Sequence, residues 1–250
     1  MNGGDGCVKR SRLFLFLAYG TLIVLGAFYL ISRGVPGTFG RFPPSDQGPH
    51  SAAALNPRAE AVVVIDAGSG QILIADRAHV SLPMGPLVRM LAALVIAENT
   101  DADEPVLVSW RAAAQPGTRL GLAHGATLDA GSLLRALWFV GARDAELALI
   151  EHVAGSEAAF ARQMAEAALR YGALQTRVAL PARGAAWSPV STAYDAALLA
   201  RAVLQDPLLS SIAGQRRVTL DWTDGRRELL HINSFLWQYP GATGIMSGYT

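Results

Sequence analysis

Two consecutive stretches decide the fold of this chain. They are AVVVIDAGSGQILIADRAH, residues 61–79, and LPMGPLVRMLAALVIAEN, residues 82–99. The two β-branched runs AVVVID and QILIAD flank AGSG, which supplies turn chemistry, so the first stretch predicts a β-hairpin. In the second stretch Pro86 opens an apolar run, at a position where its missing N–H does no harm, and this pattern predicts a helix. A hairpin and an apolar helix therefore open a domain that begins near Ala59.

After this helix the apolar pattern keeps a helical period to about residue 205 and then returns to the period of a strand. Helices are expected over residues 132–139, 144–153 and 156–171, the last closed by Gly172, and over a segment that Ser191 or Thr192 caps and that stops before Pro207. Residues 217–222 and 228–232 are expected to form a hairpin around Asp224 and Gly225, and residues 244–250 a last short strand. This order predicts an α+β fold with an α-rich insertion.

Composition excludes several classes of protein. Hydrophobic residues make up 51% of the 250 residues and charged residues 16%, which excludes disorder as the main state. A net charge of +1 gives no basic field over the whole protein and argues against a nucleic-acid partner. Cys7 is the only cysteine, and the five histidines show no metal-site spacing, so neither a disulfide framework nor a cofactor or metal ion is expected.

The N-terminal residues are expected to anchor the chain in a membrane. Leu13 to Ile31 is an uncharged stretch of 19 residues that would span about 28 Å as a helix, close to a bilayer core. Basic residues are denser before it, so residues 1–12 are expected to be a cytoplasmic tail. Residues 32–58 are rich in glycine and proline and would link the anchor to a domain over residues 59–250. The sequence thus predicts a single-pass protein of the cytoplasmic membrane with an extracytoplasmic domain.

Two alternatives remain open for this apolar stretch. A cleaved signal peptide usually has a shorter apolar region, about 7–15 residues, and a small-x-small site, a pattern that SRGVPG after Ile31 lacks. A buried soluble helix would be the other alternative, although a helix of that kind usually keeps a polar face and this stretch has none.

Five stretches carry a family resemblance: AVVVIDAGSGQILIADRAH, LPMGPLVRMLAALVIAEN, EHVAGSEAAFARQM, STAYDAALLARAVLQDP and LWQYPGATGIMSGYT. Together they resemble the serine D-alanyl-D-alanine carboxypeptidases, the low-molecular-mass penicillin-binding proteins, over residues 59–250. The resemblance implies a penicillin-binding/β-lactamase-like transpeptidase fold, in which an antiparallel-sheet lobe and a helical lobe enclose a catalytic cleft. It also implies an extracytoplasmic, membrane-tethered protein that acts on peptidoglycan stem peptides.

The first catalytic motif that the resemblance implies is altered. The family places Ser-x-x-Lys at the start of the helix after the hairpin, with the serine as nucleophile and the lysine as its base on one helix face. Pro86 stands at the serine position and offers neither a hydroxyl nor an N–H for the oxyanion hole, where loss of one donor costs roughly 10²–10³ in rate. Arg89 stands at the lysine position, and a guanidinium stays charged and cannot act as a neutral base.

The second and third motifs are altered as well. Counting back from EHVAGS, the Ser-x-Asn position reads Gly141-Ala142-Arg143, which has neither the hydroxyl nor the amide. The Lys-Thr-Gly position reads Met246-Ser247-Gly248, so the charge is lost while a hydroxyl and the glycine are kept. Ser247 and Gly248 are therefore the substrate-binding positions that the resemblance leaves in place.

The lysine content tests a Ser–Lys mechanism without any alignment. Of the 21 basic residues 20 are arginine, and the only lysine is Lys9, ahead of the predicted membrane segment. Arginine-rich coding could account for Arg89 alone but not for all the altered positions together. We therefore hypothesise a catalytically inactive, membrane-anchored homologue that binds cell-wall peptide or an envelope protein. An active serine-type D-alanyl-D-alanine carboxypeptidase and a truncated, non-functional remnant are the alternatives.

The resemblance also predicts a domain that is incomplete at its C-terminus. Chains of the family continue past the third motif with two more strands and a packing helix, and this chain stops two residues after Gly248. The missing strands would sit between the opening hairpin and the last strand, so unpaired sheet edges are expected. A fragmentary record, a decaying gene and a partner that completes the sheet are the three explanations.

Other candidate chemistry is weak. His152 is expected to be a structural or surface residue, and no G-x-S-x-G elbow supports a Ser-His-Asp triad. Trp138 and Trp237 are expected to lie in the core or the cleft wall, with sugar stacking as the alternative.

The two arginines at motif positions raise a question of charge pairing. Arg89 and Arg143 are expected to pair with Asp144 or Glu146, and a carboxylate ligand is the alternative partner for these guanidinium groups.

Overall fold

The structure is a computed structural model that describes residues 50–51, 59–178, 189–222 and 225–247. The chain divides into two compact units, residues 1–48 and 49–250, and every described residue belongs to the second unit. The predicted tail, the predicted membrane segment and all of the predicted linker except His50 and Ser51 lie outside the described residues.

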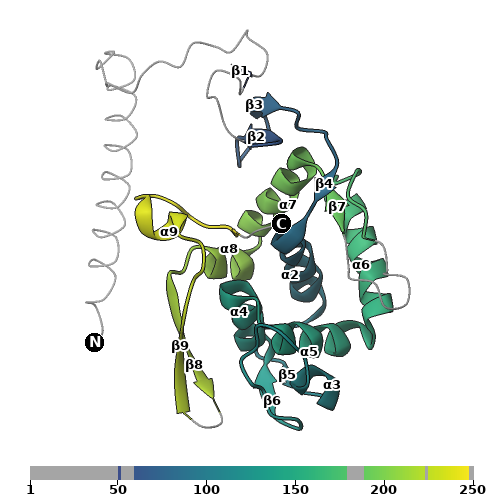
Figure 1. Cartoon of the computed structure of the whole chain (residues 1–250), viewed down its shortest axis with the longest axis vertical. Helices are drawn as coiled ribbons and strands as arrows, with labels where there is room; N and C mark the ends of the chain where they lie inside the picture. The colour runs from purple at the N-terminus through teal and green to yellow at the C-terminus, as the bar shows by residue number, and fades with distance from the viewer. Residues whose placement is uncertain (1–49, 52–58, 179–188, 223–224, 248–250) are drawn as a thin grey trace, which may run out of the picture. The chain divides into compact units, whose positions relative to one another are not determined.

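The predicted opening hairpin is confirmed (Figure 1). β2 (Val62–Ile65) pairs antiparallel with β3 (Ile72–Asp76), and β1 (His50–Ser51) pairs parallel with the other edge of β3. The turn closes because one carboxylate oxygen of Asp66 accepts hydrogen bonds from the backbone N–H and the hydroxyl of Ser69, each at 2.7 Å. The glycine-rich loop is thus a hairpin turn, as predicted.

The predicted apolar helix is confirmed, with a tighter first turn. η2 (Gly85–Leu87) is a 3₁₀ turn that contains Pro86, and it leads into α2 (Val88–Asn99). α2 buries seven consecutive residues, Met90 to Ile96, so its middle is apolar on every side. A helix of this kind is stable in water only where other elements cover it all round.

The remaining helices supply that cover. They are α3 (Trp110–Ala113), α4 (Ala130–Val140), α5 (Arg143–Ala154), α6 (Glu157–Arg170), α7 (Ala193–Gln205), α8 (Pro207–Ala213) and α9 (Phe235–Gln238). The predicted helices correspond to α4, α5, α6 and α7, and Thr192 caps α7 as expected, since its hydroxyl accepts the N–H of Asp195 at 3.0 Å. α2 contacts each helix from α4 to α8, and their buried side chains form one continuous core around it.

The hairpin is attached to this helical core by polar contacts. Arg201 on α7 donates hydrogen bonds to the carbonyl oxygens of Ala67 at 2.9 Å and Gly68 at 2.7 Å. A helix and a turn that lie far apart in the sequence are thereby fixed side by side, and β2 contacts α7 as well.

Three further two-stranded sheets lie among the helices. β4 (Leu82–Pro83) pairs with β7 (Val190–Ser191), and β5 (Pro105–Leu107) pairs with β6 (Thr127–Asp129). Every strand pair in these three sheets is antiparallel, and the order of strands, helices and strands confirms the predicted α+β class.

The third sheet is the hairpin that was predicted over residues 217–232, but its turn and its end differ from the prediction. β8 (Arg217–Trp222) pairs with β9 (Gly225–Leu230), and Gly225 opposes Trp222, so Gly225 is in the strand rather than in the turn. β9 ends at Leu230 instead of Ile232, because the ring of His231 turns inward and its Nδ1 accepts the N–H of Asn233 at 3.0 Å.

The predicted last strand, residues 244–250, is wrong in its described part. Residues 244–247 pair with no strand within the part of the chain that the structure describes, and Gly248 lies outside it. The carbonyl of Ile245 instead accepts a hydrogen bond from the indole N–H of Trp138 at 3.2 Å. This segment is therefore held by a core side chain of α4 and not by a neighbouring strand.

A search for membrane spans within the described ranges found no single helix of sufficient length and apolar character. α7 and α8 reach the required length and composition only as a pair, and they meet at a bend of 105°.

Phe160 tests the helical core. It is fully buried on α6, so Phe160→Ala is expected to lower the free energy of unfolding by roughly 3–5 kcal/mol. Leu169 lies on the same helix and is 59% exposed, so Leu169→Ala should change it by less than about 0.5 kcal/mol. Urea denaturation of both variants measures the difference, and equal losses would contradict this packing.

His231 makes stability depend on pH. Burial lowers the pKa of this imidazole below the usual value of 6.5, and its Nε2 has no described hydrogen-bond partner. The unfolded chain therefore binds the proton more readily, and the free energy of unfolding should decrease as pH falls below about 6.5. His231→Phe should flatten this decrease between pH 7.5 and 5, whereas His124→Gln, at an exposed position, should keep it.

Candidate functional site

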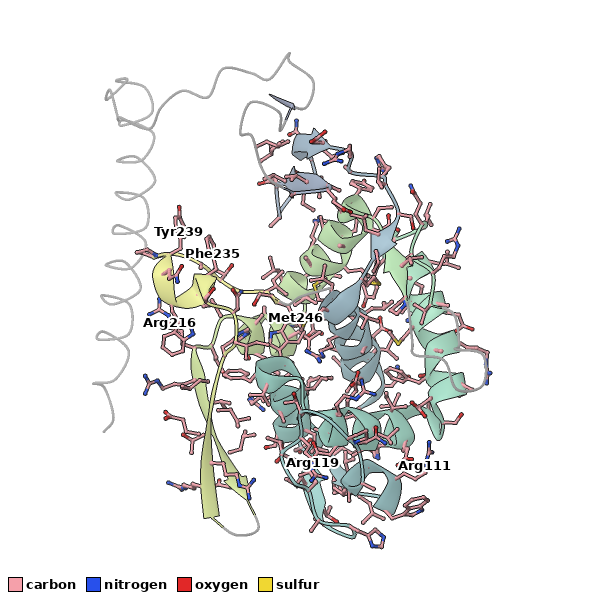
Figure 2. All side chains as sticks on the ribbon, viewed as in Figure 1. Arg111, Arg119, Arg216, Phe235, Tyr239 and Met246 are labelled. Atoms are coloured by element: carbon pink, nitrogen blue, oxygen red, sulfur yellow. The ribbon has the colours of Figure 1, made fainter. Side chains whose placement is uncertain are left out.

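The positions that the sequence analysis singled out lie on five parts of the fold. Pro86 is in η2, Arg89 is in the first turn of α2, and Gly141 ends α4. Arg143 opens α5, and Met246 lies in the extended segment after α9. Figure 2 shows Met246 beside the upper end of α2.

Pro86 fits its position without distortion of the turn around it. The N–H groups that this turn needs come from its neighbours: that of Met84 donates to the Pro189 carbonyl at 2.9 Å, and that of Leu87 donates to the Met84 carbonyl at 3.0 Å. Proline is tolerated here because an N–H in a first helical turn has no intrahelical acceptor. The turn is therefore stable with Pro86 in it, although Pro86 presents neither a hydroxyl nor a backbone N–H.

Arg89 lies directly over Gly141. A Cβ built on Gly141 would stand 2.5 Å from Cζ, Nη1 and Nη2 of Arg89 alike. Equal distances to the central carbon and both terminal nitrogens mean that the guanidinium presents its face to the glycine. The structure thus brings together the two positions at which the first and second motifs were predicted.

Gly141 is suited to this contact in two ways. Its backbone is left-handed, with φ 67° and ψ 41°, which ends α4 and which residues with a side chain rarely adopt. The absence of a Cβ also leaves the space that the guanidinium fills. Any larger residue at 141 would displace Arg89.

The carboxylates next to these arginines behave differently from one another. Asp144 is fully buried, and its oxygens accept the N–H groups of Leu120, Gly121, Leu122 and Ala145 at 2.8–3.1 Å. The predicted pairing of an arginine with Asp144 is therefore wrong, because this carboxylate holds a loop through its backbone. An acidic residue near a helix N-terminus was the available sequence signal for such a role.

Glu146 is the residue that pairs with Arg143, which confirms one of the two carboxylate partners predicted for this arginine. The two side chains are 4.0 Å apart, at i and i+3 of α5, and the Arg143 side chain is 53% exposed. Burial raises the pKa of Glu146, while the positive charges of Arg143 and Arg89 act to lower it and Glu157 adds to the rise. No described residue forms a hydrogen bond or ion pair with Arg89.

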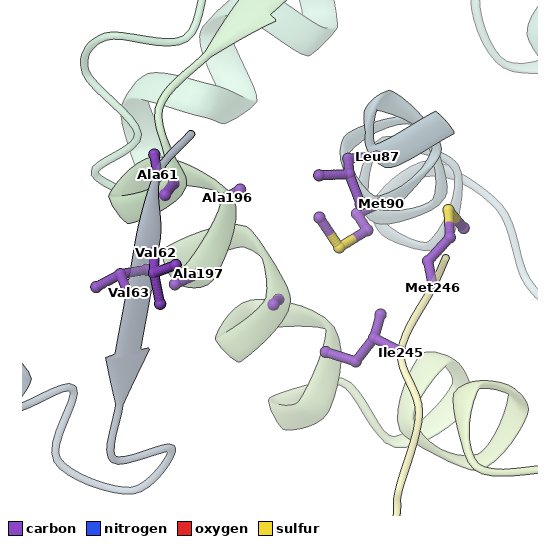
Figure 3. Close-up of a pocket in the computed structure, with 11 residues that line it drawn as sticks. Ala61, Val62, Val63, Leu87, Met90, Ala196, Ala197, Ile245 and Met246 are labelled. Atoms are coloured by element: carbon purple, nitrogen blue, oxygen red, sulfur yellow. The ribbon is translucent and has the colours of Figure 1, made fainter. Parts of the chain in front are cut away.

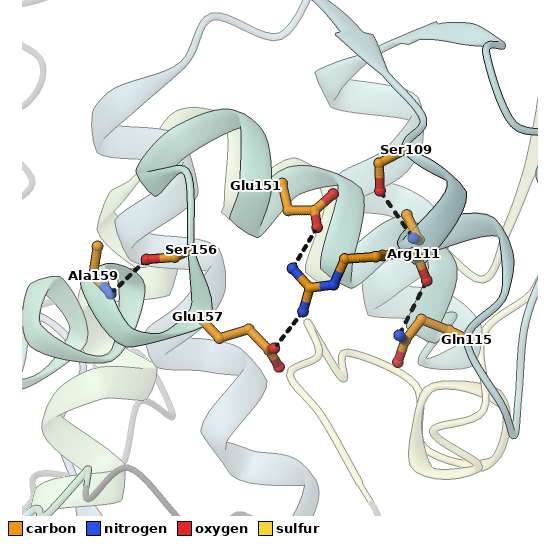
Figure 4. A network of polar contacts seen from close by, with 8 residues as sticks. Ser109, Arg111, Gln115, Glu151, Ser156, Glu157 and Ala159 are labelled. Atoms are coloured by element: carbon orange, nitrogen blue, oxygen red, sulfur yellow. Dashed lines mark hydrogen bonds and ion pairs between the residues drawn. The ribbon is translucent and has the colours of Figure 1, made fainter.

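A network on the adjoining surface joins three helices (Figure 4). Arg111 on α3 donates to Glu151 of α5 at 3.0 Å and to Glu157 at the start of α6 at 3.2 Å. These groups are partly exposed, so the pairs add little stability, but they commit both carboxylates to Arg111.

Met246 faces a different side of α2, where an open apolar cavity of about 400 Å³ lies (Figure 3). Its walls come from four places: the opening hairpin, the start of α2, α7 and the segment that holds Ile245. The lining residues are Ala61, Val62, Val63, Leu87, Met90, Ala193, Ala196, Ala197, Ala200, Ile245 and Met246. None of these described lining residues carries a charge, so the cavity fits apolar groups.

The remaining candidates take structural or surface positions. Trp138 is buried in the core, whereas Trp237 is 41% exposed and donates to the carbonyl of His231 at 3.1 Å. Beside it, Phe235 and Tyr239 stack with ring centroids 5.1 Å apart on the outer side of α9, as Figure 2 shows. Sequence reasoning did not single out this exposed pair.

His152 makes polar contacts with Thr100 and Glu104. The Nε2 of His152 lies 3.1 Å from both the Thr100 hydroxyl and a Glu104 carboxylate oxygen, a structural contact of the expected kind. Among the described residues no group of three or more His, Cys, Asp or Glu side chains could hold a metal ion.

Comparison with known sequences gives a consistent set of matches. The profile of a family described as D-alanyl-D-alanine carboxypeptidase matches residues 48–250. The D-alanyl-D-alanine carboxypeptidase DacB2 of Mycobacterium tuberculosis is 28% identical over 194 residues, which cover 77% of this chain and 66% of the relative. DacF of Bacillus subtilis is 26% identical over 202 residues, which cover 78% and 52%. The chain thus spans between about half and two thirds of these relatives' lengths.

Solved structures resemble this one in fold. A crystal structure of a D-alanyl-D-alanine carboxypeptidase from Mycobacterium tuberculosis has a TM-score of 0.71 at 26% identity, covering 83% of this chain and 76% of that one. Penicillin-binding protein 6B of Escherichia coli has a TM-score of 0.66 at 23% identity, covering 84% and 66%, and this likeness concerns the fold alone. The predicted penicillin-binding, transpeptidase-like fold is confirmed by these matches.

The contact between Arg89 and Gly141 can be tested by a double-mutant cycle. Gly141→Ala is expected to cost about 1–3 kcal/mol of unfolding free energy for the left-handed backbone, and more because its Cβ collides with Arg89. In an Arg89→Ala background only the backbone cost should remain, so the two changes should couple by at least about 0.5 kcal/mol.

Gly155 supplies the matched control. It also ends a helix, with φ 69°, and no atom lies within 4 Å of its built Cβ. Gly155→Ala should therefore cost the same with or without Arg89. Denaturation curves of the six proteins measure this, and additive losses at Gly141 would show that Arg89 does not pack there.

Proposed function

This chain belongs to the D-alanyl-D-alanine carboxypeptidase family, and we propose that it binds a cell-wall peptide without hydrolysing it. The observation that carries the proposal is Pro86 at the start of the central helix. Acyl transfer by a serine peptidase needs a nucleophilic oxygen and a donor for the oxyanion, and proline supplies neither.

Arg89 supports the same proposal. A base next to the nucleophile has to accept a proton in its resting state, and a guanidinium remains protonated. The Arg89 guanidinium packs against Gly141, the residue at the predicted second motif, and Gly141 has no side chain that could take part in catalysis. In addition, the only lysine of the chain is Lys9. Two independent observations thus argue against a Ser–Lys mechanism: the residues at positions 86 and 89, and the lysine content of the chain.

Binding in place of catalysis is supported by what the chain retains. Ser247 keeps a hydroxyl at the third motif position, and Gly248 keeps the small residue after it. Serine can donate to and accept from a peptide backbone without any covalent step. We propose these two as substrate-binding positions, and a peptidoglycan stem peptide as the ligand, in preference to an envelope protein.

The same proposal includes a place in the cell. The uncharged stretch from Leu13 to Ile31 and the basic residues before it support a single-pass anchor in the cytoplasmic membrane with residues 59–250 on the extracytoplasmic side. There the domain would reach the peptidoglycan that the family's substrates come from.

Labelling with a fluorescent penicillin tests the absence of catalysis. The full chain should form no covalent adduct and should release no D-alanine from a pentapeptide that ends in D-alanyl-D-alanine. An active carboxypeptidase of the family, assayed in parallel, should do both. An adduct on any residue of the domain, or D-alanine release above the buffer rate, would establish the active enzyme instead.

A thermal melt of the full chain, followed by far-UV circular dichroism, separates a binding protein from a remnant. A cooperative transition is expected, because the described core is continuous around α2. A melt without a transition would favour the non-functional remnant.

A further inference from the structure

The hydrogen-bonding edge of the Arg89 guanidinium has no partner among the residues that the structure describes. Because its face lies on Gly141, the N–H groups, which lie in its plane, point sideways and not into the glycine. Arg89 is half-buried, and within residues 59–178, 189–222 and 225–247 no residue forms a hydrogen bond or ion pair with it. None of its nitrogens is among the side-chain atoms that are buried without a hydrogen-bond partner in the described part of the chain.

The neighbouring carboxylates already have other partners among the described residues, and the charge of Arg89 reaches Glu146 only as a Coulombic effect without an ion pair. Asp144 uses its oxygens on four backbone N–H groups, and Glu146 lies at ion-pair distance from Arg143. Further out, Glu151 and Glu157 both bind Arg111. Where Arg89 meets Gly141, a half-buried cation is therefore present whose donors have no hydrogen-bond or ion-pair partner among the described residues.

The chemistry of a guanidinium decides which ligand fits. Its planar fork binds a carboxylate through two parallel hydrogen bonds, and partial burial strengthens such charge-assisted bonds. A peptide that ends in D-alanyl-D-alanine carries a free carboxylate at its terminus. The terminal carboxylate of such a peptide therefore matches the planar donor fork of Arg89.

We propose that Arg89 binds the terminal carboxylate of the peptide ligand, so that a position occupied by a catalytic base in the family serves recognition in this chain. This inference rests on the proposed function, since it names the residue that selects the ligand. Gly141 is then a positioning residue, because its missing Cβ lets the guanidinium lie flat.

Isothermal titration calorimetry of the full chain tests this with two probes, a tripeptide ending in D-alanyl-D-alanine and its C-terminal amide. The wild-type protein should bind the acid about tenfold or more tightly than the amide. Arg89→Gln should weaken binding of the acid to the level of the amide and leave binding of the amide unchanged. Arg162→Gln removes the same charge from an exposed position on α6 and should change neither affinity.

A second variant keeps the test decisive if Arg89→Gln fails to fold. Arg89→Lys keeps the charge but loses the planar fork, and it should lose part of the preference for the acid while its melt stays cooperative. Equal affinity of the wild-type protein for acid and amide would overturn the role of Arg89 and leave the proposed function standing. No binding of either peptide would overturn both.

Discussion

The burial of α2 is the constraint on which the rest of the structure depends. Seven consecutive residues of this helix are withdrawn from water, and an apolar stretch of that kind needs cover on every side. The helices from α4 to α8 provide it, and their packing fixes where the first turn of α2 stands. Arg89 in that turn and Pro86 in the 3₁₀ turn before it are therefore held in place by a core that does not depend on their chemistry.

The contact of Arg89 with Gly141 shows that the residues at these two positions are compatible with one another. A guanidinium needs more room than a lysine amine, and the residue beneath it has no Cβ. At the same time Gly141 has to take the left-handed conformation that ends α4. One glycine thus meets a backbone requirement and a packing requirement, and this places a permanent positive charge beside the start of the central helix.

The two sides of α2 differ in character. Leu87 and Met90 face an apolar cavity whose far wall includes Val62 and Met246, whereas Arg89 points toward Gly141 and the charged start of α5. Helical spacing makes this division, because residues three apart share a face and their neighbours do not. A ligand that reached both sides would meet apolar walls on one and a guanidinium on the other.

The sequence by itself determined the opening hairpin, the central helix and the helices α4 to α7, since periodicity and helix caps are local properties. Tertiary structure alone decided that Asp144 holds a loop instead of an arginine, that residues 244–247 form no strand, and that Arg89 lies on Gly141. These outcomes depend on which groups, distant in the sequence, the packed fold places within reach of a buried donor or acceptor. The indole of Trp138, for example, reaches the Ile245 carbonyl across more than a hundred residues of chain, and no local pattern records such a meeting.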